Sequence, residues 1–507
     1  MSADLPSSPP SSPDRVRIRL EPLAAELELA RGGSLAAGLA AHGVEFPCGG
    51  VGECGGCGVR VLSGALAITE ADTAAFTPDQ LAHGWRLACQ ARAHEPLVLE
   101  CGQWHMEILS DATVSSPQVH SKSNKIAIDL GTTTIAAQLI DAASGNVLGV
   151  ETMLNPQTAF GADVMSRVRA ALEGQDLTTP IRAALGQLAA RTASGRASQV
   201  AEVLLVGNTV MHHLFCGLDV EPLSHVPFAS PQLAERCFTP SELGWDFPAV
   251  CIVRFARCIG GFVGSDILAG IVAAGIARSD ALAVLVDLGT NGEIAIGNRN
   301  GIVCASTAAG PAFEAGSIRM GMRAVTGAIA YVALADHTLR PTVIGNVAPR
   351  GICGSGLVDA VAAGLRLGQI LSNGRVAGDA KIFPVAPPVV LHQSDIRELQ
   401  LAKGAIAAGF RLLLKRLRAD VRALHAVHLA GAFGNYVQIE SALRIGLLEA
   451  PHSIIHAAGN TALRGAKMLL LAGEPTLPAI EHVSLAADPA FQDEFADCMA
   501  FPEAHNL

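Results

Sequence analysis

Alternating apolar and polar residues near the start of the chain predict a small domain built from short strands. The alternation is clear in RVRIRL (residues 15–20) and ELEL (residues 26–29), and it is typical of half-buried strands. Ser34–Leu39 predicts a short helix with Ser34 as its N-cap. Further strands are expected at Val59–Leu62 and Pro96–Leu99. Together these elements predict a small α+β domain over residues 15–103.

After residue 124 the pattern changes to apolar strands that alternate with Ala/Leu-rich helices, which is typical of an α/β fold. Strands are expected at residues 125–129, 135–140, 203–206 and 283–287, and helices at residues 181–191, 357–367 and 405–417. Residues 104–124 are polar and serine-rich, which is the composition of a linker. The Pro/Ser-rich residues 1–14 predict a disordered tail.

One motif occurs twice in the α/β region. Residues 126–134 (IAIDLGTTT) recur as residues 284–292 (VLVDLGTNG), so an apolar strand ends twice in Asp-Leu-Gly-Thr. The two aspartates, Asp129 and Asp287, are 158 residues apart (287 − 129). The repeat predicts two related domains, at residues 125–279 and 280–495.

The repeated turn is suited to binding nucleotide phosphates. Backbone N–H groups converge in such a turn and can hold phosphate oxygens, while its aspartate can hold a hydrated Mg²⁺ ion. Asp129 and Asp287 are therefore the candidate Mg²⁺ residues. The candidate phosphate-binding residues are Gly131, Thr132, Thr133, Thr134, Gly289, Thr290, Asn291 and Gly292. Glu293 follows the second turn and is a candidate for positioning the attacking water, the alternative being an exposed, merely solvated glutamate.

Motifs of other enzyme classes do not occur in the sequence. The chain has no G-x-x-x-x-G-K-[ST] loop, which disfavours the commonest alternative ATPase design. It also has no G-x-S-x-G elbow and no His-Glu-x-x-His helix, so hydrolase interpretations have little support.

Four of the 12 cysteines lie between residues 48 and 89. Five residues separate Cys48 from Cys54, two separate Cys54 from Cys57, and 31 separate Cys57 from Cys89. The loop is rich in glycine, whose backbone can turn N–H groups toward cluster sulfurs. The spacing resembles that of adrenodoxin-like [2Fe–2S] ferredoxins, and the flanking strands favour a β-grasp domain. A structural zinc site on Cys54 and Cys57 is the alternative, and Cys101 is a fifth cysteine that could replace Cys89 as a ligand.

Composition and charge narrow the function classes further. The 507 residues carry a net charge of −10, and 50% of them are hydrophobic. An acidic chain with a pI of about 5.9 argues against nucleic-acid binding. Mean hydropathy is +0.37, which raises the question of a membrane segment. The apolar stretch Ile267–Ala277 is too short to span a bilayer, so we expect it to form a buried core helix. We therefore expect no membrane partner. Scattered cysteines and the lack of a secretory segment predict a cytoplasmic protein.

The paired turns resemble the phosphate loops of the actin, heat-shock chaperone and sugar-kinase superfamily. That superfamily clamps ATP between two ribonuclease-H-like domains. Residues 429–435 (LAGAFGN) resemble its adenosine motif, and residues 351–356 resemble one of its connecting segments. The resemblance implies that adenosine contacts Gly431, Ala432, Phe433, Gly434 and Asn435.

A [2Fe–2S] domain ahead of this ATPase fold resembles the reductive activators of corrinoid proteins. Residues 207–214, 260–266 and 309–314 are similar to that family too. The resemblance implies ATP-dependent reduction of Co(II) to Co(I) in a corrinoid methyl-carrier protein, with electrons from a reductase or a reduced ferredoxin. It implies a [2Fe–2S] cluster held by Cys48, Cys54, Cys57 and Cys89, with ATP and Mg²⁺ as further cofactors. A homodimer is compatible with it.

Three other functions remain open at this point. A small-molecule kinase with a redox module would use the same loops but needs a base beside a substrate hydroxyl. A scaffold switched by ATP would polymerise, and an activator of a radical dehydratase would normally carry a [4Fe–4S] cluster between two subunits. His212 and His213 are expected to pack or cap a helix, and Met320 and Met322 to pack a loop.

Overall fold

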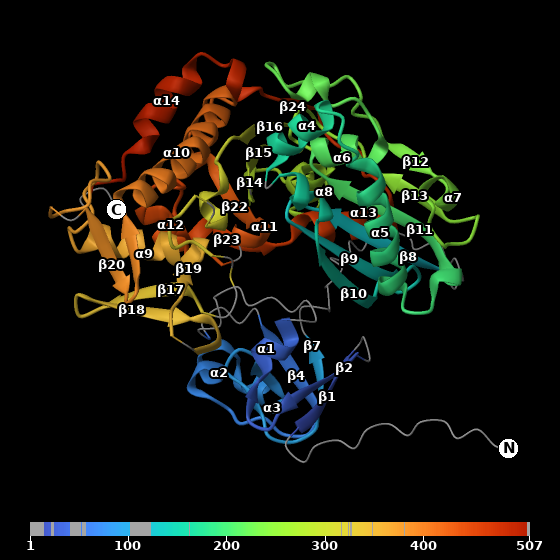
Figure 1. The fold of residues 1–507 in the computed structure, drawn as a ribbon, viewed down its shortest axis with the longest axis horizontal. Coiled ribbons are helices and arrows are strands. Elements are labelled where there is room, and N and C mark those ends of the chain that lie inside the picture. Colours follow the sequence, from blue (N-terminus) through green and yellow to red (C-terminus); the bar gives the residue numbers. More distant parts are fainter. Residues whose placement is uncertain are drawn as a thin grey trace. The chain divides into compact units, whose positions relative to one another are not determined.

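A computed structural model of the chain describes residues 15–21, 25–40, 52, 57–101, 123–161, 163–289, 291–315, 317–322, 324, 327–346, 348–379, 381–434 and 436–503. The chain divides into two compact units, Met1–Glu107 and Ile108–Leu507 (Figure 1). Each unit has its own sheets.

The first unit contains a five-stranded mixed sheet in the order β2-β1-β7-β4-β5. Its strands are β1 (Arg15–Glu21), β2 (Ala25–Ala30), β4 (Gly58–Ser63), β5 (Trp85–Leu87) and β7 (Leu97–Cys101). Strand β1 runs antiparallel to β2 and parallel to β7. Its apolar residues Val16, Ile18 and Leu20 are buried while the arginines between them are exposed, as the alternation predicts. With helix α1 (Leu35–Ala40), this sheet confirms the expected β-grasp fold.

Two short helices of the first unit were not expected from periodicity. They are α2 (Glu70–Ala75) and α3 (Pro78–Ala82), and each begins with a threonine capping box, at Thr69 and Thr77. Strands β3 (Gly33–Ser34) and β6 (Arg92–Ala93) form a small separate pair. Capping signals, rather than an apolar stripe, mark helices of this length.

The second unit begins with a six-stranded sheet in the order β10-β9-β8-β11-β13-β12. Its strands are β8 (Asn124–Leu130), β9 (Thr134–Asp141), β10 (Val147–Leu154), β11 (Val200–Gly207), β12 (Arg236–Phe238) and β13 (Ile252–Phe255). The first three form an antiparallel meander, and β11 and β13 run parallel to β8. The motif strand β8 is therefore central.

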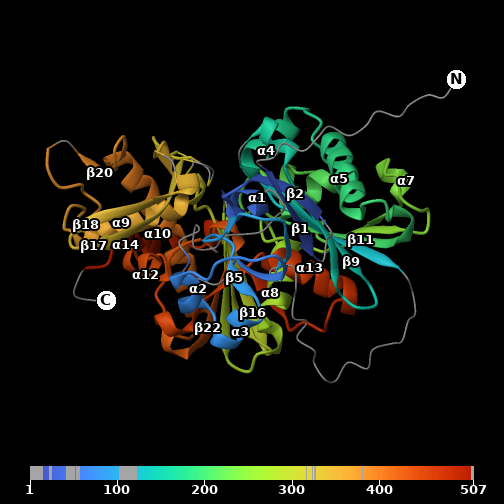
Figure 2. The same cartoon turned by 90° about the horizontal axis from the view of Figure 1, so that it is seen from below.

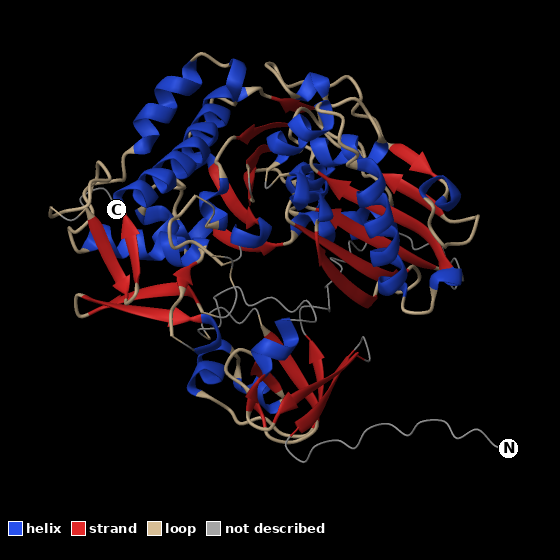
Figure 3. Ribbon diagram, viewed as in Figure 1, coloured by secondary structure: helices blue, strands red, loops and turns tan. Residues whose placement is uncertain are grey.

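A second sheet repeats this topology in the order β23-β22-β14-β15-β16-β24. Its strands are β14 (Leu282–Leu288), β15 (Gly292–Asn298), β16 (Gly301–Thr307), β22 (Leu424–Ala430), β23 (Ile455–Gly459) and β24 (Ile480–His482). Again three antiparallel strands are followed by two that run parallel to the first of them. Both sheets are visible among the surrounding helices in Figure 3. The shared strand order confirms the prediction of two related, ribonuclease-H-like halves.

Helices cover both sheets and join the two halves. The longer ones are α4 (Val164–Leu172), α5 (Thr178–Ala193), α6 (Thr209–Cys216), α8 (Ser265–Ala273), α9 (Gly354–Arg366), α10 (Gln393–Arg416), α13 (Thr461–Ala472) and α14 (Ala490–Met499). Helices α8 and α13 lie side by side in both views (Figures 1 and 2). Helix α13 follows the second sheet in sequence but packs against β8 and β11 of the first.

An additional lobe is inserted between the strands of the second half. It contains the sheet β18 (Thr338–Val343), β17 (Ala328–Ala335) and β19 (Gly351–Ile352), and the hairpin β20 (Ile382–Ala386) and β21 (Val389–His392). Short helices α7 (Pro240–Leu243), α11 (Gly431–Gly434) and α12 (Ile439–Arg444) complete the unit.

The structure corrects one helix prediction and confirms another. Helix α10 begins at Gln393, twelve residues before the expected start at residue 405, because its polar first turns still bury Ile396 and Leu399. The apolar stretch after Asp266 forms α8, whose Ile267 and Leu268 are buried, as expected of a core helix. Among the described helices, none is both long enough and apolar enough to cross a bilayer.

Candidate functional site

Four acidic side chains from both halves of the second unit influence one another electrostatically. Asp129 lies near the end of β8, Asp287 near the end of β14, and Asp266 in the first turn of α8. Glu293 on β15 is the direct cross-strand partner of Asp287. The charge of Asp129 acts on Asp287, and both act on Asp266, so the structure brings the two predicted aspartates together.

Burial raises the pKa of every member of this group, and repulsion from neighbouring carboxylates raises it further for Asp287, Asp266 and Glu293. Burial raises the pKa of Asp129 to about 6, against a smaller lowering by its hydrogen bond from Asn460. The pKa of Asp287 rises to about 7 and that of Asp266 to about 8, through burial first and neighbouring aspartates second. Burial, followed by Asp266 and Asp287, lifts the pKa of Glu293 well above its usual range. Such a group favours either bound protons or a cation between its members.

A hydrated cation needs fewer protein ligands than a directly ligated one. Among the described residues, no three His, Cys, Asp or Glu side chains are close enough to hold a metal ion between them. A cation that keeps several of its waters needs only one or two carboxylates, which is the usual behaviour of Mg²⁺.

The first turn, residues 131–133 between β8 and β9, is held by polar side chains. Asn155 Nδ2 donates to the Gly131 carbonyl at 2.9 Å, and the fully buried Arg167 donates to the Thr132 carbonyl at 2.6 Å. Asn208 Nδ2 donates to Thr132 Oγ1 at 3.1 Å. A Cβ atom on Gly131 would lie 2.4 Å from the carbonyl oxygen of Thr134. The turn is thus fixed from several sides and requires glycine at its first position.

Asn460, a residue from the other end of the chain, contacts the aspartate of the first turn. It is the N-cap of α13, and its Nδ2 donates to Asp129 Oδ2 at 2.8 Å. Its own Oδ1 accepts the N–H of Leu463 at 2.7 Å. The C-terminal half therefore supplies a hydrogen-bond donor to the Asp129 carboxylate of the N-terminal half.

The second turn connects β14 to β15, and Glu293 follows it as the second residue of β15. The Gly289 N–H donates to the Asn291 carbonyl at 3.0 Å, and Thr290 lies outside the described residues. Thr307 Oγ1 donates to the Gly292 carbonyl at 2.9 Å. Glu293 is only 8% exposed and accepts a hydrogen bond from Ser306 Oγ at 3.1 Å. It is therefore a buried strand residue, and the alternative of an exposed loop glutamate is wrong.

The predicted adenosine segment begins where β22 ends. Gly431 has a φ of +80°, and a Cβ atom there would lie 2.5 Å from Asp287 Oδ1. Only glycine can therefore bring this backbone so close to the aspartate. The ring of Phe433 is buried against Phe313, with the ring centres 4.7 Å apart. Gly434 ends helix α11, while Asn435 and the side chain of Ala432 lie outside the described residues.

Two of the four predicted cluster cysteines lie at one end of the β4–β5 pair. Cys57 is buried directly before β4, and Cys89 follows β5 by two residues. The Ala88 N–H donates to the Cys57 carbonyl at 3.1 Å, which places the two segments next to each other. Cys101, the last residue of β7, pairs in register with Val59. Cys48 and Cys54 lie outside the described residues.

The histidine pair belongs to the core, as expected. His213 bonds the Thr209 carbonyl at 2.8 Å and Ser230 Oγ at 2.7 Å, and the His212 ring meets Phe255 edge-on. Both side chains are buried, which lowers the pKa of each, that of His212 to about 4. Met320 and Met322 are partly buried against core clusters, which confirms their packing role.

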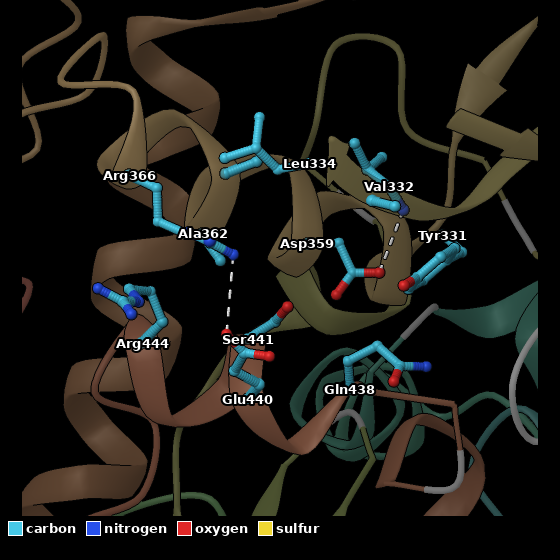
Figure 4. Close-up of a pocket in the computed structure, with 12 residues that line it drawn as sticks. Tyr331, Val332, Leu334, Asp359, Ala362, Arg366, Gln438, Glu440, Ser441 and Arg444 are labelled. Carbon is cyan, nitrogen blue, oxygen red and sulfur yellow. Dashed lines mark hydrogen bonds and ion pairs between the residues drawn. The ribbon is translucent and has the colours of Figure 1, made fainter. Parts of the chain in front are cut away.

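A pocket of about 230 Å³ lies away from the acidic group, between β17, α9 and α12 (Figure 4). At the wall of this pocket, Arg366 Nη1 lies 3.7 Å from Glu440 Oε1. The Asp359 carboxylate accepts a hydrogen bond from the Val332 N–H at 3.2 Å. None of the predicted site residues lines this pocket.

Sequence reasoning missed Asp266 and the polar residues that hold the first turn. Asp266 ends a stretch already noted for its family resemblance, but no periodicity identifies it as part of an acidic group. A repeated tripeptide, Gly-Asn-Thr at 207–209 and 459–461, would have identified Asn208 and Asn460.

Three family models match successive parts of the chain. Residues 18–94 match the 2Fe-2S iron–sulfur cluster binding domain. Residues 125–279 match the RACo middle region, and residues 281–506 match the C-terminal domain of RACo, described as an ASKHA domain. The [2Fe–2S] domain and the nucleotide-binding fold are thereby supported.

Individual relatives extend over most of the chain. The corrinoid activation enzyme RamQ of Eubacterium limosum is 36% identical over 415 residues, covering 73% of this chain and 69% of the relative. A Co(II) methylated amine-specific corrinoid protein reductase of Methanosarcina barkeri is 27% identical, covering 68% and 69%. The solved structure of a reductive activator for corrinoid, iron–sulfur protein matches with a TM-score of 0.66 and 26% identity. That match covers 96% of this chain and 98% of the other.

Proposed function

Because this chain belongs to the family of reductive activators of corrinoid proteins, we propose that it uses ATP to drive one electron onto a corrinoid cobalt. In this reaction Co(II) bound to a methyl-carrier protein gains the electron and becomes Co(I). The observation that carries the proposal is the joining, in one chain, of a [2Fe–2S] domain and a duplicated fold whose two turns share one acidic group.

Energetics explain why ATP is needed. Plant-type [2Fe–2S] clusters have potentials of roughly −400 mV, and reduction of Co(II) to Co(I) requires a stronger driving force than ordinary cellular reductants supply. Closure of two domains around ATP can favour a conformation in which the cobalt environment or the docking of the carrier is changed. When bound, the cluster supplies a one-electron donor, which suits a one-electron step at cobalt.

The residues of the second unit divide the nucleotide chemistry between them. Asp129 and Asp287 would orient a hydrated Mg²⁺, which the raised pKa values of the group favour. The two turns, residues 131–134 and 289–292, would hold the phosphates, and residues 431–435 would receive the adenosine. Glu293 would position the attacking water, because it is buried and lies directly opposite Asp287.

The sulfur ligands of the cluster would come from the first unit. Cys57 and Cys89 lie at one end of adjoining strands, which fits two ligands of the same cluster. Cys48 and Cys54 would complete the set. The electron donor would be a reductase or a reduced ferredoxin in the cytoplasm, and the protein is compatible with a homodimer.

The test uses anaerobically purified protein and a corrinoid carrier held as Co(II). A reductant is added and the visible spectrum is followed with and without Mg-ATP. Co(I) should form only with ATP, and should be lost in Cys57→Ser. The matched control is Cys258→Ser, which changes a buried cysteine of the second unit and should retain activity. Co(I) formation without ATP, or none in the presence of an intact cluster, contradicts the proposal.

A further inference from the structure

Two helices of the second unit begin with the same tripeptide. Gly207-Asn208-Thr209 follows β11 and starts α6, and Gly459-Asn460-Thr461 follows β23 and starts α13. In both cases the asparagine is the N-cap. The Oδ1 of Asn208 accepts the Met211 N–H at 3.0 Å, and that of Asn460 accepts the Leu463 N–H at 2.7 Å.

In both asparagines the side-chain amide nitrogen donates a second hydrogen bond, outside the helix. Asn208 Nδ2 donates to Thr132 Oγ1 at 3.1 Å, and Asn460 Nδ2 donates to Asp129 Oδ2 at 2.8 Å. Serine and aspartate cap helices about as well as asparagine, but of these three only asparagine carries its acceptor and its N–H donors on separate atoms, whereas serine has one hydroxyl for both and ionised aspartate has no donor. The amide donor, rather than the cap, accounts for asparagine at these positions.

Asn460 differs from Asn208 in where it comes from and what it contacts. It belongs to the C-terminal half, yet α13 packs on β8, so its side chain reaches the carboxylate at the end of that strand. We propose that Asn460 is a positioning residue for ATP hydrolysis, which holds the Asp129 carboxylate in its reactive orientation across the two halves. This role rests on the proposed function.

The contact leaves one carboxylate oxygen for the site. The hydrogen bond from Asn460 to Oδ2 favours one orientation of the carboxylate, in which Oδ1 would face the hydrated cation. A hydrogen bond to a charged group is among the stronger ones in proteins. Loss of this hydrogen bond should therefore slow ATP hydrolysis more than it weakens ATP binding, because the two turns also contribute to ATP binding.

The test separates capping from positioning with three variants. Asn460→Ser and Asn460→Asp keep a capping oxygen but lose the amide donor, while Asn460→Ala loses both. Both cap-retaining variants should lower kcat for ATP hydrolysis about tenfold or more, with KM for ATP within about threefold of wild type and a melting midpoint above that of Asn460→Ala. Asn460→Asp should be the slower of these two, because it places a second carboxylate beside Asp129. Asn460→Ala should lower both kcat and the melting midpoint.

Thr239→Ala is the matched control, because it removes the side-chain cap of the short helix α7 and should leave kcat unchanged. Wild-type kcat in Asn460→Ser overturns the positioning role and leaves the proposed function intact. Absence of ATP turnover in the wild-type protein overturns the proposed function, and this role with it.

Discussion

The two Asp-Leu-Gly-Thr turns have the same sequence pattern and the same place in the fold, but their surroundings differ. Asp129 lies opposite Ala136 on the neighbouring strand, whereas Asp287 lies opposite Glu293. The first turn and its aspartate receive hydrogen bonds from Asn155, Arg167, Asn208 and Asn460. At the second, Thr307 bonds the backbone at Gly292.

This difference shows how a duplicated fold can carry unequal chemistry. The first turn is held rigidly by amide and guanidinium donors, which suits a fixed platform for phosphate. The second turn brings an extra buried acid beside its aspartate. We infer that the second half supplies the acid opposite its aspartate, in keeping with the role proposed for Glu293, while each half contributes acidic residues to the group.

The largest expected effect comes from the aspartate of the second turn. Asp287→Asn should lower ATP turnover by roughly 10²–10³-fold, because it removes a preorganised charge from a buried site. Asp129→Asn should be less severe, since Glu293 and Asp287 remain together. Steady-state ATP hydrolysis measures both, and the visible iron–sulfur spectrum should be unchanged. Unchanged turnover in Asp287→Asn would sink the assignment.

The acid that distinguishes the second turn is the next target. Glu293→Gln preserves the side-chain shape but removes a group able to orient and deprotonate water. We expect kcat to fall about 10²-fold while the affinity for ATP stays near that of wild type. Single-turnover hydrolysis and equilibrium nucleotide binding separate the two quantities. Weaker binding with unchanged kcat would show that Glu293 acts on the bound nucleotide instead.

The hydrogen bonds at the two turns allow a comparison of stability. Arg167→Lys cannot reproduce the buried bonds to the Thr132 and Gly161 carbonyls, and it should lower the free energy of unfolding by about 2 kcal/mol. Thr307→Val removes one hydrogen bond, from Thr307 Oγ1 to the Gly292 carbonyl. This loss should lower the free energy of unfolding by about 1 kcal/mol. Denaturant unfolding without nucleotide measures both. Equal costs would contradict the view that the first turn is the more firmly held.

The smallest effect is a pH dependence of stability in the absence of nucleotide and divalent cation. A carboxyl group whose pKa is raised by folding contributes stability below its unfolded pKa and loses it as the pH rises through the folded pKa. The pKa values of Asp129, Asp287 and Asp266 are raised to about 6, 7 and 8. Stability should therefore decrease from about pH 4 to about pH 8.

The measurement is the melting midpoint with a chelator present. We expect a fall of at least about 1 °C between pH 5 and pH 8, which corresponds to about 1 kcal/mol for a unit of the size of Ile108–Leu507. Asp266→Asn should reduce the fall, because it removes the group with the highest of the three values. A midpoint that rises with pH would show that other titrating groups dominate.

Local sequence patterns were sufficient for the strands that carry the site. The apolar runs before Asp129 and Asp287 form β8 and β14, and the repeat of the motif predicted the repeat of the topology. Family resemblance also predicted the class of protein correctly. These features depend on residues that are neighbours in sequence, so hydrophobic periodicity and short sequence motifs are enough to predict them.

Features that depend on long-range packing were not predictable in the same way. Asp266 joins the acidic group only because α8 lies between the two halves, and Asn460 reaches Asp129 only because α13 returns to the first sheet. Phe433 is buried against Phe313, which comes 120 residues earlier in the chain (433 − 313). No property of these segments taken alone indicates the surfaces they meet.

The return of α13 to the first sheet also affects how the chain is made. Ala127, Ile140 and Leu204 of the first half form one cluster with Leu463 and Ala466 of α13, and Asp129 and Asn460 are 331 residues apart. At a synthesis rate of about 5–20 residues per second, the helix leaves the ribosome roughly 15 to 70 s after the strand it covers. During that interval the nascent first half exposes an apolar sheet face, a natural target for chaperones. The hydrogen bond between Asn460 and Asp129 can form only when nearly the whole polypeptide has been translated.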